Sequence, residues 1–213
     1  MVCIAAVIST VSFLTYFANR TTTTTTAPSL IVEEFSSDRA DLAGAPLDGG
    51  HHWEVDGGAF RVADGAVTAS APTFGTAFAI VRLDVEPTAV SVLFARISAT
   101  SGLVFDFVDR SNYWSVEGAA EFGTWNVFQM HDGLKTFIAN SGANLRSGST
   151  VEVRRSDGRV EIVVDGVPVP ASITDHWPPG SGVGLLAGHL EQGATMWSRF
   201  VVTGPRGDQL TSS

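Results

Sequence analysis

SGLVFDFVDRSNYWSVEGAAEFGTWNVFQM, residues 101–130, decides the fold of this chain. The stretch reads as three short strands, GLVFDFV, NYWSVEG and TWNVFQM, with turn residues at 109–112 and 118–120 between them. Apolar and polar positions alternate along the strands, which is typical of antiparallel strands with one buried face. Asp, Ser, Asn and Gly at the breaks are residues that let a chain reverse its direction. The stretch therefore predicts an antiparallel β-meander that is rich in aromatic side chains.

The rest of the chain from residue 30 onward continues this pattern. About thirteen short strand candidates follow one another without useful helical periodicity, which is typical of a sandwich or barrel. Asp-Gly pairs suited to tight hairpins lie at 64–65, 132–133, 157–158 and 165–166. We expect an all-β, two-sheet antiparallel jelly-roll sandwich with six or seven strands in each sheet. The first strand, IVEEF at 31–35, and the last, MWSRFVV at 196–202, are complementary and are expected to pair.

Composition excludes one class of partner. The chain has 213 residues and a net charge of −9, with one lysine, Lys135, among its basic residues. No cluster of Lys or Arg is present, so we expect no binding to nucleic acid, which requires a basic patch. The lone cysteine, Cys3, excludes an intrachain disulfide, so the core alone must hold the domain together.

The N-terminal segment predicts a location outside the cytoplasm. Residues 2–18 carry no charge, and at about 1.5 Å per residue a helix of this length would span roughly 25 Å. We expect residues 1–20 to be a signal-anchor, with a cleaved signal peptide or a buried N-terminal element as alternatives. Residues 21–29 are a Thr-rich linker, 30–204 the jelly-roll domain and 205–213 a polar tail. The expected location is the membrane, with the domain facing the cell exterior, or secretion if the segment is cleaved.

The order of motifs resembles that of a known superfamily. EEF with Asp38 and Leu42 precedes Trp53 and GGAFRVADGAV; then come GLVFDFVDRSNYWSV, TWNVFQMHDG, VEVRRSDGRVEIVVDG, GVGLLA and MWSRFVV. This succession is similar to the concanavalin A-like lectin/glucanase superfamily, and in particular to laminin-G-like jelly rolls of bacterial surface and phage tail proteins. The resemblance covers nearly all of residues 31–203. It implies two curved antiparallel sheets whose concave face or rim loops bind glycans in many members, and it does not imply catalysis.

Catalytic and metal motifs do not stand out. The E-x-D-x-x-E strand motif of the glucanases that this fold resembles is missing, and retaining hydrolysis needs two carboxyl groups about 5 Å apart. The histidines have no metal-ligand spacing. Asp38, Asp41 and Asp48 in one early loop are oxygen donors of the kind that Ca²⁺ prefers, but we favour turn aspartates. We therefore expect no cofactor, and an enzymatic activity stays uncertain with the balance against it.

Candidate ligand-binding residues lie on the meander and its neighbours. Alternation places Trp114 and Val116 toward the core and Tyr113 and Glu117 outward. Aromatic rings stack on the C–H faces of sugars, while Arg, Asp and Gln side chains hydrogen-bond hydroxyl groups. The predicted ligand-binding residues are Tyr113, Trp125, Gln129, Arg96, Arg82 and Asp106.

Three functions follow from these observations. The leading hypothesis is a non-catalytic, membrane-tethered domain that binds carbohydrate or a glycosylated surface, and the acidic charge suits neutral or cationic glycans. The first alternative is a protein-interaction, adhesion or structural surface module. The second is a glycoside hydrolase with an unrecognised site. Oligomeric state is not predicted.

Overall fold

The computed structural model describes residues 29–70, 75–98, 100–171, 173–174, 178, 181–188 and 195–205. The predicted N-terminal segment 1–20, nearly all of the linker, Trp177 and nearly all of the polar tail lie outside these residues. In the described part of the chain, no helix has the length and apolar character needed to span a membrane.

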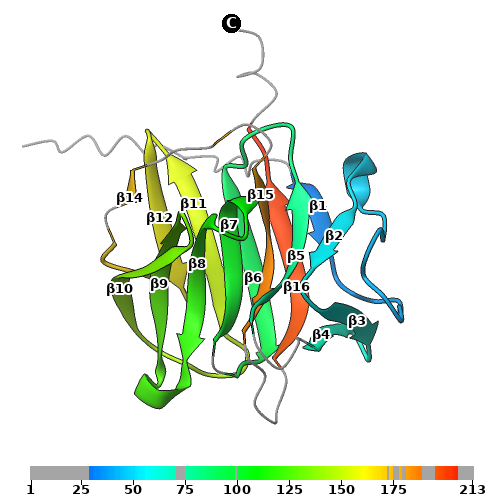
Figure 1. Cartoon of the computed structure of the whole chain (residues 1–213), viewed down its shortest axis with the longest axis horizontal. Helices are drawn as coiled ribbons and strands as arrows, with labels where there is room; N and C mark the ends of the chain where they lie inside the picture. The colour runs from blue at the N-terminus through cyan, green and yellow to red at the C-terminus, as the bar shows by residue number, and fades with distance from the viewer. Residues whose placement is uncertain are drawn as a thin grey trace, which may run out of the picture.

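Sixteen strands and two short 3-10 helices make up the described chain, so the all-β prediction is confirmed (Figure 1). The elements are β1 (Ser29–Glu33), η1 (Asp48–Gly50), β2 (Trp53–Asp56), β3 (Ala59–Ala63), β4 (Ala66–Ser70), β5 (Ala77–Arg82), β6 (Ala89–Arg96), β7 (Ser101–Asp109), β8 (Asn112–Ala119), η2 (Ala120–Phe122), β9 (Thr124–His131), β10 (Leu134–Asn144), β11 (Thr150–Ser156), β12 (Arg159–Val164), β13 (Val167–Pro168), β14 (Ile173–Thr174), β15 (Gly182–Ala187) and β16 (Met196–Thr203).

The strands form two antiparallel sheets that pack face to face. One has nine strands, in the order β13-β12-β11-β6-β16-β4-β3, with β1 added at β16 and β14 at β12. The other has seven, in the order β10-β9-β8-β7-β15-β5-β2. The expected jelly-roll sandwich is confirmed. The seven-stranded sheet has a predicted number of strands, whereas the other sheet exceeds the prediction because it also contains the two-residue strands β13 and β14.

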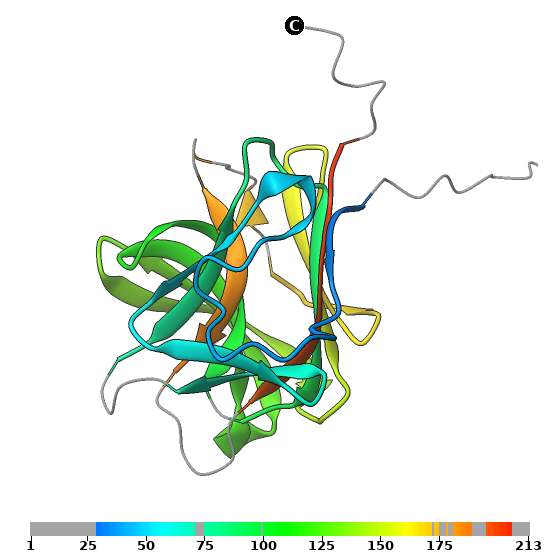
Figure 2. The same ribbon diagram turned by 90° about the vertical axis from the view of Figure 1, so that its right-hand side faces the viewer.

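The hairpins use the predicted Asp-Gly turns. At 64–65, 132–133, 157–158 and 165–166 both residues have positive φ, which matches the tight turn that the right-handed twist of the strands favours. The pairing of the two chain ends is also confirmed, since Ile31 of β1 lies opposite Val202 of β16. Figure 2 shows β1, in blue, beside β16, in red.

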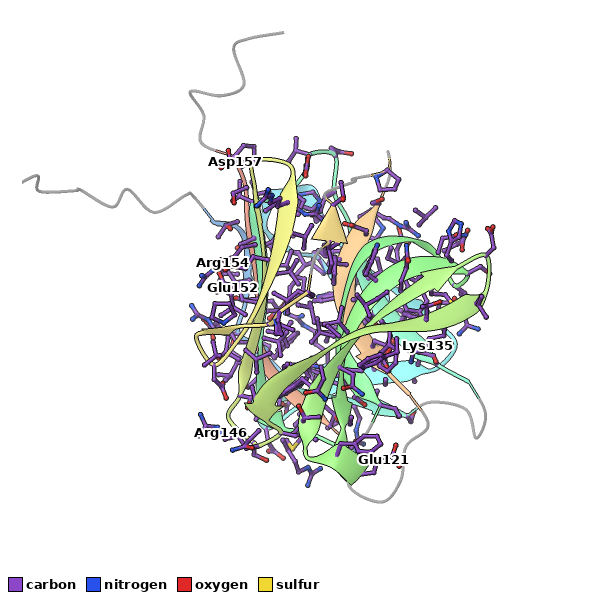
Figure 3. The ribbon with its side chains drawn as sticks, turned by 90° about the vertical axis from the view of Figure 1, so that its left-hand side faces the viewer. Glu121, Lys135, Arg146, Glu152, Arg154 and Asp157 are labelled. Carbon is purple, nitrogen blue, oxygen red and sulfur yellow. The ribbon has the colours of Figure 1, made fainter. Side chains whose placement is uncertain are left out.

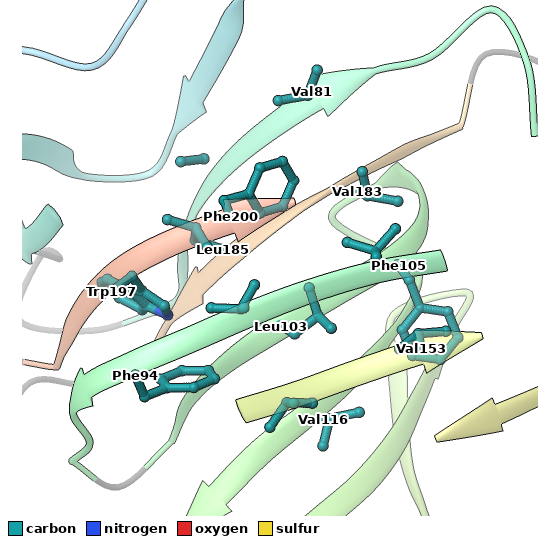
Figure 4. Packing of buried hydrophobic residues seen from close by; sticks show 14 of the residues in the cluster. Val81, Phe94, Leu103, Phe105, Val116, Val153, Val183, Leu185, Trp197 and Phe200 are labelled. Atoms are coloured by element: carbon teal, nitrogen blue, oxygen red, sulfur yellow. The ribbon is translucent and has the colours of Figure 1, made fainter. Parts of the chain in front are cut away.

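The main core fills the space between the sheets. Its large side chains are fully buried and come from both layers: Trp53, Phe105 and Trp125 from the seven-stranded sheet, and Phe94 and Trp197 from the nine-stranded sheet. Figure 4 shows Phe94, Trp197 and Phe200 facing Leu103, Leu185 and Val116 across this space. With no disulfide available, burial of this apolar surface is the dominant source of stability.

Candidate functional site

The outer face of the seven-stranded sheet, toward which Tyr113 was predicted to point, carries a second apolar cluster. Tyr113 belongs to it and is only 4% exposed, although it points outward as predicted. Its ring lies 5.2 Å from Phe78 and 5.9 Å from Phe107, measured between centroids. The members of this outer cluster are Phe78, Ile80, Val104, Phe107, Tyr113 and Leu186. Tyr113 therefore points outward as predicted but is covered by its neighbours, and the centre of this face does not present open aromatic rings.

Burial changes the acid–base behaviour of Tyr113. Loss of water around the hydroxyl raises its pKa well above the usual range, and the negative charge of Glu117 raises it further. The side chain is therefore a neutral part of the outer cluster at all physiological pH values.

Arg82 covers one side of the outer cluster. Its guanidinium lies 5.2 Å from the Phe107 ring centroid and donates to the carbonyl oxygens of Phe107 and Val108 at 2.9 and 3.2 Å. Its Nε also lies 3.2 Å from a carboxylate oxygen of Glu54. These contacts place Arg82 on the outer face and give it a packing role there.

An ion pair between the buried Glu117 carboxylate and the exposed Lys135 ammonium occupies the other side of the outer face. The carboxylate of Glu117 accepts hydrogen bonds from Ser115 Oγ at 2.6 Å and Lys135 Nζ at 2.7 Å. The same ammonium lies 4.3 Å from the centroid of the Phe128 ring. This carboxylate is thus held by two partners on β8 and β10.

Two further predicted residues lie elsewhere. Trp125 is 0% exposed and packs against Phe94 in the main core, with 4.9 Å between ring centroids. Arg96 lies at the end of β6, in the nine-stranded sheet, whereas Tyr113, Trp125 and Gln129 belong to the seven-stranded sheet. The predicted residues therefore do not share one surface. Strand alternation specifies the face of a strand on which a side chain lies but not the sheet that the strand joins.

A cleft does lie at one end of the sandwich, between the two sheets. It encloses about 500 Å³. Strands β7, β8 and β9 of the seven-stranded sheet border it on one side, and β14 and Pro178 border it on the other. Figure 3 shows this two-layer arrangement from the side, with Asp157 at one end of the sandwich and Glu121 and Arg146 at the other. The described lining residues are Asp106, Val108, Asn112, Tyr113, Trp114, Gln129, Met130, His131, Ile173, Thr174 and Pro178. Three of the six predicted residues, Asp106, Tyr113 and Gln129, are among them.

Trp114 is the aromatic platform of this cleft. It faces the inter-sheet space, as alternation predicts, but it is half-buried because it borders the cleft. Its ring stacks on Phe105 with 6.2 Å between centroids and 20° between planes. Gln129 lies directly across from it on β9. A braced indole with amide and hydroxyl groups beside it is suited to stacking on a ring that carries hydroxyl groups.

Asp106 lies at the inner end of the cleft and has a specific partner. Its carboxylate accepts a hydrogen bond from Arg155 of β11, so this ion pair joins the two sheets. Both side chains are buried, at 6% and 5% exposure. Arg155 also lies 3.5 Å from the carboxylate of Glu86. The carboxylate of Asp106 is thus oriented by a fixed cation, while His131 at the outer end is exposed and 3.7 Å from Asp132.

Two of the three early-loop carboxylates, Asp38 and Asp41, accept hydrogen bonds from the backbone. Asp38 accepts the backbone N–H of Asp64 at 3.3 Å, and Asp41 accepts that of Ala43 at 2.9 Å. Among the residues that the structure describes, no three His, Cys, Asp or Glu side chains gather in a way that would hold a metal ion.

The geometry is that of a two-sheet jelly roll with a cleft at its end, and comparisons agree on the fold. No protein-family model and no curated protein match the chain. Among solved structures, SCLam, a non-specific endo-β-1,3(4)-glucanase of family GH16, is 14% identical, with a TM-score of 0.54 over 85% of this chain and 94% of its own. The carbohydrate-binding module CBM66 from Bacillus subtilis is 14% identical, with a TM-score of 0.53 over 71% of this chain and 91% of its own. Domain 4 of AbnA, a GH43 extracellular arabinanase from Geobacillus stearothermophilus in complex with arabinotriose, is 14% identical, with a TM-score of 0.52 over 84% and 93%.

These matches show that the chain has the concanavalin A-like jelly-roll fold, as the order of its sequence motifs predicted. Sequence reasoning missed Trp114 as a residue that lines the cleft, because the alternation that assigned it correctly to the inter-sheet face says nothing of where that face is uncovered. It also missed Thr174 and Ile173, which no strand pattern had marked. Ligand binding by Asp106 and Gln129 stays a prediction.

Proposed function

We propose that this domain binds neutral carbohydrate without catalysing a reaction, through the cleft at the end of the sandwich. The observation that carries the proposal is the half-buried Trp114, braced by Phe105 and placed beside Gln129. Such a ring offers a flat apolar surface at little cost in conformational entropy, because packing already fixes its orientation. The carbohydrate-binding module, the glucanase and the arabinanase domain that share this fold add support at the level of fold alone.

Charge in the cleft supports a neutral ligand. Asp106 is the one carboxylate side chain among the described lining residues, and the positive charge of Arg155 is in direct contact with it. The chain as a whole carries a net charge of −9, which disfavours polyanionic glycans. Hydrolysis with retention or inversion requires two carboxyl groups that flank the scissile bond, so a lining with one paired carboxylate favours binding over cleavage.

Binding to a panel of neutral polysaccharides tests this proposal. We expect the domain to be retarded in affinity electrophoresis by at least one of laminarin, lichenan and arabinan. Trp114→Ala should weaken that binding about 30-fold, which corresponds to about 2 kcal/mol. Phe122→Ala is the matched control, because Phe122 is an aromatic residue of η2 that is 70% exposed and does not line the cleft.

Three results would contradict the proposal. The first is that neither these polysaccharides nor a glycan array retains the folded domain. The second is that Trp114→Ala and Phe122→Ala bind equally well. The third is release of reducing sugar by the wild-type domain, which would favour the glycoside hydrolase alternative.

We further propose that residues 1–29 tether the domain to the outer face of a membrane. The uncharged run at 2–18 and the Thr-rich spacer support this arrangement. Expression of the full chain followed by membrane fractionation, and protease treatment of intact cells, tests it. The proposal requires the protein in the membrane fraction and the domain accessible to the protease.

An adhesion module is a second candidate, favoured by the exposed edge of the seven-stranded sheet. Edge strand β10 presents Leu134 at 71% and Phe137 at 55% exposure. Unpaired strand edges with apolar side chains are sites at which other chains add a strand. Loss of cell-surface adhesion in Leu134→Lys with Phe137→Lys, together with unchanged adhesion in Trp114→Ala, would favour this function.

A further inference from the structure

A single row of side chains leads out of the main core along the cleft. Strand register places Phe105 of β7 opposite Trp114 of β8, Trp114 opposite Gln129 of β9, and Gln129 opposite Thr136 of β10. The next row toward the core, Leu103–Val116–Val127, is fully buried. In the outgoing row Phe105 is buried, Trp114 and Gln129 are half-buried and Thr136 is exposed. The row thus passes from closed to open across four neighbouring strands.

The inner end of this row is closed by a bulge in β7. Phe105 packs in the main core whereas Phe107 packs in the outer cluster, although residues two apart on a regular strand share a face. Asp106 between them has φ of +50°, and the pairing of β7 with β8 shifts there. A bulge of this kind redirects a side chain. Asp106 is turned toward the other sheet, where Arg155 meets it and closes the inter-sheet space.

The outer end of the row is open at the edge of the sheet. β10 is the last strand of the seven-stranded sheet, and β14 lies at the corresponding edge of the other sheet (Figure 1). Thr136 and Leu134, which alternate on the face of β10 that carries this row, are both exposed. Among the described residues, the row is therefore closed at its β7 end, beside Asp106, and open at β10, while Val108 and His131 border the cleft toward the end of the sandwich.

We infer that the cleft recognises the terminal residue of a neutral glycan chain rather than an internal segment. This inference rests on the proposed function. The end residue stacks on Trp114 with its hydroxyl groups toward Asp106, and the following residue leaves over Gln129 and Thr136. Strands β8 and β10 are two strand spacings apart, roughly 10 Å, which is comparable with the length of a disaccharide. An internal segment that followed this row would need to continue between the sheets past β7, where the Asp106–Arg155 ion pair stands.

Binding stoichiometry as a function of chain length tests the inference. The probes are laminari-oligosaccharides and arabino-oligosaccharides of increasing length and their parent polymers, titrated calorimetrically into the domain. Recognition of an end gives one bound domain per linear chain at every length, and affinity that stops rising beyond the first few residues. Recognition of an internal segment gives a number of bound domains that grows with chain length, which would overturn the inference while leaving the proposed function intact.

Variants of β10 add a second readout. Thr136→Ala should weaken binding of a trisaccharide two- to fivefold, since it removes a hydroxyl at the exit. Phe137→Ala is the matched control, because Phe137 is the adjacent residue on the opposite face of the same strand. Equal affinities for both variants would also overturn the proposed path. If no member of either series and no array glycan binds, the proposed function itself fails, and that result is distinct from a stoichiometry that grows with length.

Discussion

The ion pair between Asp106 and Arg155 is expected to determine how firmly the two sheets hold together at the cleft. Three variants test this: Arg155→Met, which keeps the aliphatic length, Asp106→Asn, which keeps the shape of the carboxylate, and the double variant. Asn is a suitable replacement because it tolerates the positive φ of +50° at position 106 better than most residues. Neither substitution should therefore add backbone strain to the loss of the ion pair.

The magnitudes follow from burial of the two side chains, at 6% and 5% exposure. Arg155→Met leaves a carboxylate buried without its cation, which should lower the free energy of unfolding by about 3–5 kcal/mol. Asp106→Asn should cost less, about 1–3 kcal/mol, because Glu86 stays 3.5 Å from the guanidinium. The double variant should be more stable than the sum of the two losses implies, by at least about 1 kcal/mol.

Urea denaturation at pH 7, followed by tryptophan fluorescence, measures these changes. The larger loss corresponds to a fall in Tm of roughly 6–20 °C for a domain of this size. Glu86→Gln is the control, since its carboxylate is 46% exposed and should contribute less than about 1 kcal/mol. Losses below about 0.5 kcal/mol in both single variants, as surface pairs give, or strict additivity in the double variant, would refute the reasoning.

Three further substitutions probe the core, the outer cluster and a turn. Trp125→Ala should lower the free energy of unfolding by about 3–5 kcal/mol, because it empties a fully buried site beside Phe94; a loss below about 1 kcal/mol in urea titration would contradict this. The raised pKa of Tyr113 means that the native state keeps a proton that the unfolded state loses above about pH 10. The protonated hydroxyl therefore contributes fully to stability below about pH 10. Above about pH 10 the free energy of unfolding should fall by about 1.4 kcal/mol per pH unit. Tyr113→Phe should flatten that fall, and an unchanged slope in denaturation between pH 9 and 11.5 would argue against it. Gly133→Ala should cost about 1 kcal/mol in thermal unfolding, since φ is +77° there and the surrounding space is ordinary; an unchanged Tm would show that the turn relaxes freely.

Local patterns predicted the fold well because its determinants are local. The four Asp-Gly pairs form turns with positive φ, and alternation along β8 assigned Trp114 and Tyr113 to opposite faces correctly. The candidate site was less accessible to this reasoning. Whether an inward residue is buried depends on how far the opposite sheet extends, and whether an outward residue is exposed depends on neighbours such as Phe78 and Phe107. These are properties of strands far apart in the sequence.

The bulge in β7 likewise depends on contacts that the local sequence pattern does not reveal. Nothing in GLVFDFV marks Asp106 as the residue at which the strand changes face, because Asp between two apolar residues fits plain alternation equally well. Its partner Arg155 lies 49 positions away in the sequence, on a strand of the other sheet. The Asp106–Arg155 ion pair at the inner end of the cleft could therefore not be predicted from adjacent residues.

Pairing of β1 with β16 has a topological consequence. Ser29 lies opposite Thr203, so the first and last strands begin and end side by side. A short peptide would join them without crossing the sandwich, and the chain could then be opened at the exposed η2 turn around Glu121. A permuted domain of this kind should fold, and the same adjacency allows the whole sandwich to be inserted into a surface loop of a host protein, with both connections leaving through one opening.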